Sequence, residues 1–213
     1  MKTDDLISML ATGVTPVDPR LPARRFATAL AIGAAGALLL MAALLGVRRD
    51  LAEVALTPLF WAKVALPLVI AIGALATLAR LARPGARAGR PSLLIAAPVA
   101  VVWIAALAVL AAAPAGERLA LVLGSTWKVC PSLIALLSVP GFVATFSALR
   151  SLAPTRLRLA GAVGGLLAGA VATLVYCLHC PEMGVPFWGV WYLLGMLVPT
   201  VVGAVVGARV LRW

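Results

Sequence analysis

The sequence predicts an all-α fold, a bundle of six transmembrane helices with both chain termini on the cytoplasmic side. Three observations lead to this prediction. Of the 213 residues, 63% are hydrophobic and only 12% are charged, and the mean hydropathy is +1.10. Soluble domains are about half apolar and about a quarter charged, so an ordinary water-soluble domain is excluded. Apolar runs of about 20 residues recur along the chain, and basic residues are distributed unevenly between the loops.

The six expected helices follow one another with short loops between them. Each run is long enough to cross about 30 Å of hydrocarbon at about 1.5 Å per residue. Proline, glycine and charged residues interrupt the runs and mark the loops. The predicted helices are Phe26–Val47, Leu59–Ala79, Leu93–Ala113, Thr126–Leu149, Leu157–Leu178 and Trp188–Val210. We therefore expect a polar segment over residues 1–25 and a six-span domain over residues 26–213.

The outer ends of the second, fourth and sixth expected helices are similar to one another. Residues 57–64 (TPLFWAKV), 124–131 (GSTWKVCP) and 184–192 (GVPFWGVWY) each contain Trp, and Lys follows closely in the first two. This similarity favours three successive helical hairpins. The alternative is that Trp and snorkelling Lys accumulate at membrane interfaces in any protein.

The distribution of Lys and Arg predicts the orientation. One set of loops and termini carries 13 of the 18 basic residues, and the other set carries the remaining five. Short cytoplasmic loops collect Lys and Arg, so the richer side is expected to be cytoplasmic. Topology thereby explains the net charge of +11. We expect contact with membrane lipid and no nucleic acid partner.

All three cysteines lie at the expected outer ends of the fourth and fifth helices. Cys130 and Cys180 are each followed by proline, which lacks an N–H group and ends or bends a helix, so the neighbouring thiol is held in place. Cys177 and Cys180 lie in the segment YCLHCPEMGVPFWGVWY, which also contains the single histidine, His179. This composition indicates a functional segment.

Four interpretations of the cysteines remain open. Cys130 forms a disulfide with Cys180 or Cys177, as an oxidising compartment allows. A soft metal ion such as Cu, Zn or Cd, acting as a signal and not as a constitutive cofactor, binds Cys130, Cys180, His179 and Cys177, with Met183 as a further donor. The CxxC spacing of Cys177 and Cys180 is typical of thiol redox catalysis. In the fourth interpretation the thiols only pack.

Residues 1–25 form the only sizeable polar segment. The stretch MKTDDLISMLATG predicts a short amphipathic helix that begins at Thr3 as its N-cap and ends at Gly13. The following prolines predict an extended tether. So short a helix is marginal alone in water, and its two acidic residues disfavour an anionic lipid surface, so we expect a protein partner. The expected partner-binding residues are Asp4, Asp5, Leu6, Ile7, Met9 and Leu10.

Four motifs resemble a known family. These are MKTDDLI…LA at the start, W-x-x-CP at the fourth helix, LHCPE…PF…WY…GM at the fifth and sixth, and G-x-R-x-LRW at the end. They are similar to the motifs of the NrsF-type membrane anti-sigma factors, and the resemblance covers nearly the whole chain.

The resemblance implies a six-helix protein of the bacterial inner membrane. Such a protein holds an extracytoplasmic-function sigma factor inactive and releases it under heavy-metal or oxidative stress. It also implies that the two Cys-Pro cysteines, here Cys130 and Cys180, are the signal-responsive residues, whereas Cys177 is outside the family pattern.

The chain is not expected to be an enzyme. The alternative, a membrane thiol-disulfide oxidoreductase that uses the CLHC segment, normally needs a second cysteine pair to relay electrons, and only Cys130 remains. A transporter is disfavoured because the middles of the predicted helices carry no ionisable residue. The sequence therefore favours transcription regulation by a stress-responsive membrane protein.

Overall fold

The computed structural model describes residues 3–12, 18, 20–83, 85, 88–152 and 154–212. Within these residues it contains helices and no strand, and six helices are long and apolar enough to cross a membrane. The predicted all-α fold with six spans is confirmed. The spans are Leu21–Leu44, Pro58–Leu81, Arg90–Ala112, Cys130–Arg150, Leu157–Tyr176 and Val185–Val210.

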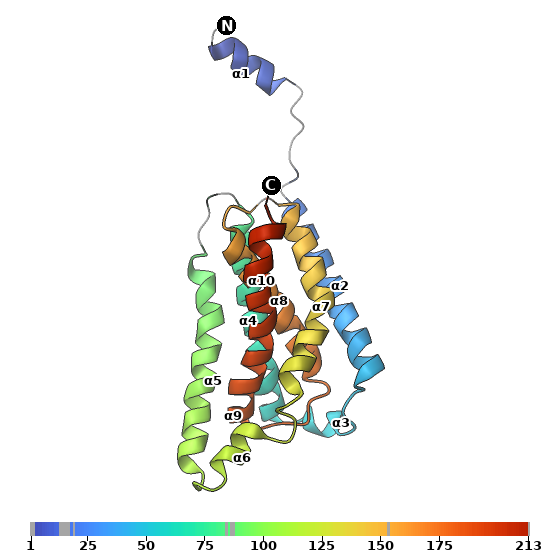
Figure 1. Ribbon diagram of the computed structural model, residues 1–213, viewed down its shortest axis with the longest axis vertical. Helices are drawn as coiled ribbons and strands as arrows, with labels where there is room; N and C mark the ends of the chain where they lie inside the picture. Colours follow the sequence, from blue (N-terminus) through green and yellow to red (C-terminus); the bar gives the residue numbers. More distant parts are fainter. Residues whose placement is uncertain are drawn as a thin grey trace.

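Short helices accompany the six spans (Figure 1). In chain order the elements are α1 (Thr3–Ala11), α2 (Leu21–Leu44), α3 (Leu51–Val54), α4 (Pro58–Leu81), the 3₁₀ turn η1 (Arg90–Ser92), α5 (Leu93–Ala112), α6 (Arg118–Leu123), α7 (Cys130–Arg150), α8 (Leu157–Tyr176), α9 (Val185–Phe187), the π-helical segment η2 (Trp188–Tyr192) and α10 (Leu193–Val210).

Most predicted helix ends lie within three residues of the observed ones, but two predicted starts differ by more, and proline explains both. The first span begins at Leu21 and not at Phe26, because Pro22 stands in its first turn, where a missing N–H costs nothing. The end of the expected tether is therefore helical. The fourth span begins at Cys130 and not at Thr126, again with a proline in the first turn. Residues 13–17 and 19 of the tether, and the expected helix end at Gly13, lie outside the described residues.

Helix α8 forms the centre of the bundle. It packs against α10, α7, α4 and α2, and 72% of its most apolar stretch is buried. A Cβ atom on Gly161 or Gly165 would collide with the carbonyl oxygens of Gly203 and Pro199 on α10. Backbone contact of this kind is how helices without a hydrophobic driving force associate in lipid. The glycine-rich sequence of α8 thus determines its central place.

The helices do not pair as three successive hairpins. Helix α10 packs closely on α8, its predecessor among the spans, but α2 packs on α7, which is distant in the sequence. Helix α5 is peripheral: it contacts α4 and α9, and only Ala106 of its residues is buried. The similarity of the helix ends therefore reflects their common position in the bundle.

The bundle has two distinct ends (Figure 1). The cysteine end holds α3, α6 and α9 and the first turns of α4 and α7. The arginine end holds the first turns of α2 and α8 and the last turns of α4, α7 and α10. The fold thus places the cysteines and most of the basic residues at opposite ends of the bundle, as the sequence predicts.

Candidate functional site

The three cysteines meet at the cysteine end. Cys130 is the first residue of α7, Cys177 directly follows α8, and Cys180 ends the turn after α8, where its N–H donates to the carbonyl of Tyr176 over 3.0 Å. All three are buried free thiols. The prolines after Cys130 and Cys180 lie where the chain starts or leaves a helix, so the sequence fixes both thiols at helix boundaries.

Two tyrosines complete a thiol cluster, which we define as Cys130, Cys177, Cys180, Tyr176 and Tyr192. The rings of Tyr176 and Tyr192 meet edge to face with centroids 6.0 Å apart. The Tyr176 hydroxyl lies near the thiols of Cys130 and Cys180, and the Tyr192 hydroxyl lies near those of Cys177 and Cys180. Within the part of the chain that the structure describes, the buried Tyr192 hydroxyl has no hydrogen-bond partner of acceptable geometry. Such orphaned groups are uncommon and mark a polar, specialised interior.

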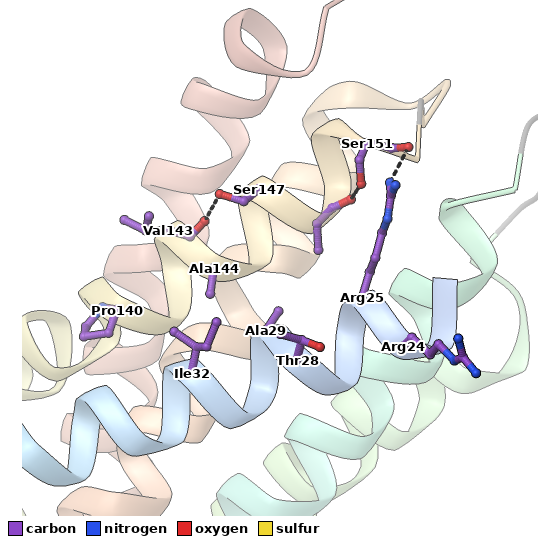
Figure 2. Close-up of a pocket in the computed structure, with 11 residues that line it drawn as sticks. Arg24, Arg25, Thr28, Ala29, Ile32, Pro140, Val143, Ala144, Ser147 and Ser151 are labelled. Carbon is purple, nitrogen blue, oxygen red and sulfur yellow. Dashed lines mark hydrogen bonds between the residues drawn. The ribbon is translucent and has the colours of Figure 1, made fainter. Parts of the chain in front are cut away.

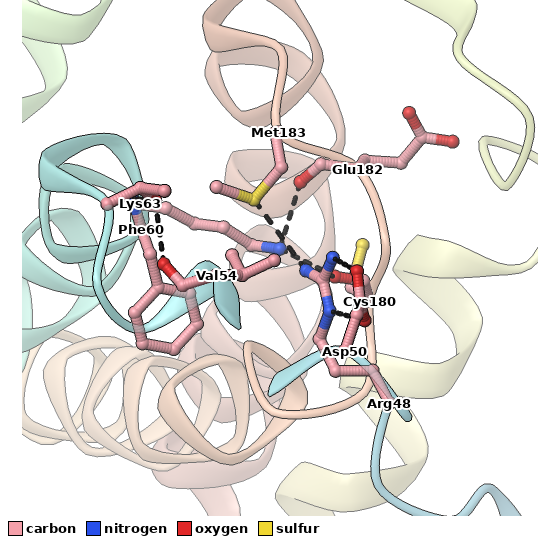
Figure 3. A network of polar contacts seen from close by, with 9 residues as sticks. Arg48, Asp50, Val54, Phe60, Lys63, Cys180, Glu182 and Met183 are labelled. Atoms are coloured by element: carbon pink, nitrogen blue, oxygen red, sulfur yellow. Dashed lines mark hydrogen bonds and ion pairs between the residues drawn. The ribbon is translucent and has the colours of Figure 1, made fainter. Parts of the chain in front are cut away.

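Lys63 is the cation of the thiol cluster. It comes from the second turn of α4 and is fully buried. Its ammonium donates to the carbonyl of Cys180 over 2.7 Å and to that of Glu182 over 2.9 Å (Figure 3). It also lies 5.7 Å from the centroid of the Tyr192 ring. The sequence places Lys63 near the outer end as a snorkelling side chain. It points inward instead, because these acceptors compensate its desolvation.

Arg48 is a second cation on the same carbonyl. Its guanidinium donates to the Cys180 carbonyl over 3.1 Å and contacts the Met183 sulfur at 3.6 Å. It also forms a bidentate ion pair with Asp50, with both N···O distances 2.8 Å. This hydrogen bonding lowers the pKa of Asp50 to about 2. The Arg48 side chain is only 6% exposed, so the pair holds the α2–α3 loop against the Cys180 segment.

Glu182 joins the two cysteine-bearing segments. Its carboxylate points away from Lys63, toward the turn that precedes α7 (Figure 3). It accepts the backbone N–H and the hydroxyl of Ser125 over 2.6 and 2.5 Å, and the N–H of Thr126 over 3.2 Å. The loop that carries Cys180 is therefore tied to the turn just before Cys130. Any movement of one segment acts on the other.

The structure does not preform the four-residue metal site. Nδ1 of His179 donates to the carbonyl of Gly46 over 2.9 Å, and the ring packs 5.7 Å from that of Tyr176. Among the described residues, no group of three or more His, Cys, Asp or Glu side chains is arranged to hold a metal ion. His179 thus contacts the loop between α2 and α3, whereas Cys130, Cys177 and Cys180 lie together.

The Cys177 thiol is held in its protonated form. Burial raises its pKa to about 12, although the positive charge of Lys63 acts in the opposite direction. The thiolate is the nucleophilic species, so burial disfavours thiol exchange that starts at Cys177 at neutral pH, as it does at the other two buried thiols. This environment differs from that of a CxxC redox catalyst, in which the first thiol has a lowered pKa.

The predicted amphipathic helix exists at the N-terminus. Helix α1 covers Thr3–Ala11 and carries Asp4 and Asp5 in its first turn, which complement the helix dipole. Thr3 is the first helical residue, whereas the sequence predicts it as the N-cap. The apolar residues Leu6, Ile7, Met9 and Leu10 are 39–69% exposed. This exposed apolar surface stands apart from the bundle (Figure 1).

Some site residues have only a weak signature in the sequence. Glu182 and Tyr192 belong to the LHCPE…PF…WY motif, whereas Arg48 and Lys63 contact the Cys180 segment from distant parts of the chain. Lys63 is marked in the sequence by one signal only: it is a charged residue within the apolar run of α4. Such residues are rare within membrane spans and usually have a partner. The contact of Arg48 follows only from the packing.

The fold and the site together define a class: a multi-span helical protein with a buried thiol cluster at one end of its bundle. A family model described as a negative regulator of sigma F, NrsF, matches residues 10–213. Over the full length of both chains, the sequence is 53% identical to the probable anti-sigma-F factor NrsF of Azospira oryzae and 35% identical to the anti-sigma-F factor NrsF of Caulobacter vibrioides. No solved structure matches the chain.

The chain belongs to the NrsF family. It is an anti-sigma-F factor, a negative regulator of a sigma factor, and its family is a regulatory kind of protein. The predicted family resemblance is confirmed, and a sigma factor is its partner. Its six apolar helices are compatible with a multi-pass membrane protein.

Proposed function

We propose that this anti-sigma factor lies in the bacterial inner membrane with both termini in the cytoplasm and sequesters an extracytoplasmic-function sigma factor. In this proposal the sigma factor binds helix α1 and is released when Cys130 and Cys180 react with a heavy metal or an oxidant at the periplasmic face. The observation that carries the proposal is the placement of the thiol cluster at one end of a helical bundle whose other end continues toward α1.

The surroundings of Cys130 and Cys180 support a sensing role. An oxidant that accepts two electrons joins the two thiols as a disulfide and releases two protons, whereas a soft metal ion displaces the same protons and binds both sulfurs. In either case thiolate charge develops beside Lys63, whose ammonium is buried against the cluster. A fixed cation in a low-dielectric site stabilises that charge strongly.

The packing supports transmission through the bundle. Joining Cys130 to Cys180 changes the contact between α7 and the segment after α8. Helix α7 packs along α2, and α2 leads through residues 12–20 to α1. The signal releases the sigma factor if the reacted cysteines favour one of two helix arrangements over the other.

A cysteine exchange tests the sensing role. Cys130→Ser and Cys180→Ser should each abolish induction of the target genes by cadmium or hypochlorite while repression without stress persists. Cys177→Ser is the matched control, since its thiol is equally buried but outside the proposed pair, and it should respond normally. Normal induction in Cys130→Ser and Cys180→Ser would contradict the role of the pair. Loss of induction in Cys177→Ser alone would favour the oxidoreductase alternative.

Helix α1 is tested separately. Met9→Asp and Leu10→Asp place charge on its exposed apolar face and should abolish co-purification of the sigma factor, raising target-gene expression without stress. Ser8→Ala changes an exposed polar position of the same helix and is the control. Retained co-purification in both aspartate variants would assign the sigma factor to another surface. Reporter fusions at each terminus establish the orientation.

A further inference from the structure

A groove runs between α2 and α7 on the outside of the bundle. The two helices touch where Gly33 faces Gly141, so closely that a Cβ atom on Gly33 would lie 2.7 Å from the Gly141 Cα atom. From this crossing toward the arginine end, the helices enclose an open groove of about 740 Å³ between them (Figure 2). The groove exists because small residues, Ala29, Ala144 and Ala148, line its floor.

The part of the groove nearer the Gly33–Gly141 crossing is suited to a hydrocarbon chain. Its walls carry Ile32 and Val143, which are 55% and 60% exposed and face away from the bundle core. The hydroxyl of Ser147 donates to the carbonyl of Val143 over 2.9 Å, so it presents no unpaired donor to the groove. An apolar surface that opens sideways from a membrane-spanning bundle meets lipid tails.

The part of the groove nearer the arginine end is cationic. Arg24 and Arg25 line its mouth at the arginine end; Arg25 extends toward Ser151, whereas Arg24 points away from it (Figure 2). Arg25 donates to the carbonyl of Ser151, the residue after α7, over 2.8 Å, which uses one of its five N–H groups. Arg24 is 73% exposed, and the nearest Asp18 oxygen is 3.8 Å from its guanidinium. Two guanidinium groups thus stand where an apolar groove reaches the membrane surface.

We propose that this groove binds one anionic phospholipid, with its phosphate at Arg24 and Arg25 and one acyl chain between Ile32 and Val143. Guanidinium groups pair well with phosphate, and basic pockets between membrane helices bind acidic headgroups. Helix α1 also carries acidic residues and an apolar face, but that face is the proposed binding site of the sigma factor and α1 stands apart from the bundle. Charge complementarity and the lateral opening of the groove therefore select the lipid.

The proposed lipid lies between the two helices that connect the cysteine end with α1. It lies between α2, which leads to α1, and α7, which begins at Cys130. The acyl chain fills the space beside the Gly33–Gly141 crossing and keeps the two helices apart at the arginine end. Lipid occupancy therefore stabilises one relative position of the helices.

The test uses the full-length protein in nanodiscs or detergent and native mass spectrometry. Phosphatidylglycerol should bind in a one-to-one complex and phosphatidylcholine should not. Arg24→Gln with Arg25→Gln should weaken phosphatidylglycerol binding about thirtyfold, the equivalent of about 1 kcal/mol for each arginine. Ala144→Phe fills the groove without a change of charge and should also prevent binding.

Two matched controls define the outcome. Arg83→Gln with Arg90→Gln removes two exposed charges from the same end outside the groove, and Val101→Phe adds a ring to the exposed surface of α5. Both should bind phosphatidylglycerol like the unaltered protein. Equal weakening by the two double arginine variants, or normal binding by Ala144→Phe, would overturn the site. Binding that appears only after deletion of residues 1–12 would assign the groove to α1.

Discussion

The two ends of the bundle use charge in opposite ways. The cysteine end carries the smaller share of the basic residues, but Arg48 and Lys63 are withdrawn from solvent and both donate to the carbonyl of Cys180. The arginine end carries most of the basic residues, and those such as Arg24 and Arg83 are exposed. One end uses charge to hold atoms in fixed positions, whereas the other presents charge to its surroundings.

The difference shows that a charge count does not locate a site. A buried cation is stabilised by specific acceptors, and removal of either partner leaves a desolvated group uncompensated. An exposed arginine gains little from its neighbours because water screens it. Substitutions at the two ends should therefore differ in their effect on stability by several-fold, and this difference is measurable.

The largest effect is expected from the combined loss of Lys63 and Arg48. Lys63→Met or Arg48→Met alone leaves the Cys180 carbonyl one donor, and each should lower the free energy of unfolding by about 1–2 kcal/mol. The double variant leaves that buried carbonyl without either donor, so its loss should exceed the sum of the single losses and reach about 4 kcal/mol. Denaturant unfolding in detergent gives the full double-mutant cycle.

A matched pair of exposed residues supplies the control for that cycle. Lys128 and Arg49 belong to the same end of the bundle and are exposed. Lys128→Met with Arg49→Met should change the free energy of unfolding by less than about 0.5 kcal/mol. A loss comparable to that of the buried pair would mean that total charge, and not the shared carbonyl, stabilises the cysteine end.

The second effect concerns Glu182. Glu182→Ala removes the acceptor of the Ser125 and Thr126 groups and should lower the free energy of unfolding by about 2 kcal/mol, the range of hydrogen bonds to a charged group. Amide hydrogen exchange at Ser125 should accelerate at the same time. Glu53→Ala, an exposed carboxylate on α3, should change neither quantity. Unaltered exchange at Ser125 in Glu182→Ala would refute the link between the two cysteine segments.

The sequence was sufficient for the helices and for the grouping of the cysteines. Long apolar runs determine the six spans, and the short loops bring Cys130 and Cys180 to one end. The helix pairing was not predictable in the same way, because the contact of α2 with α7 depends on Gly33 meeting Gly141 across more than 100 residues. Small residues identify a close contact but not its partner.

The electrostatic part of the site was less predictable still. A lysine near the end of an apolar run is compatible with snorkelling toward water or with burial, and only the carbonyls of Cys180 and Glu182 decide between them. Glu182 likewise follows a Cys-Pro pair in the sequence, which does not reveal the partner of its carboxylate. Its acceptor role depends on the turn before α7, which is distant in the chain.

The third prediction is a dependence on acid pH. Arg48 lowers the pKa of Asp50 to about 2 from its usual value, so the native state binds this proton less readily than the unfolded chain. The stabilisation by this pair is therefore constant above about pH 4 and is lost as the pH falls toward 2. In that window the unaltered protein should lose stability relative to Asp50→Asn, as thermal unfolding at several pH values reports. Parallel curves for the two proteins would show that the ion pair does not form in solution.

The smallest effect is expected at the arginine end. Arg83→Gln with Arg90→Gln should change the free energy of unfolding by less than about 0.5 kcal/mol, since both side chains are exposed. Added salt should leave even this small difference unchanged or reduce it, because surface charges are screened. Unfolding of both proteins at low and high ionic strength measures this.

A loss near 2 kcal/mol would mean that these arginines have fixed partners like those of Arg48, and the contrast between the two ends would then be one of degree. A small value means that Arg83 and Arg90 contribute little to the stability of the fold, whereas Arg48 and Lys63 of the cysteine end are held by specific acceptors.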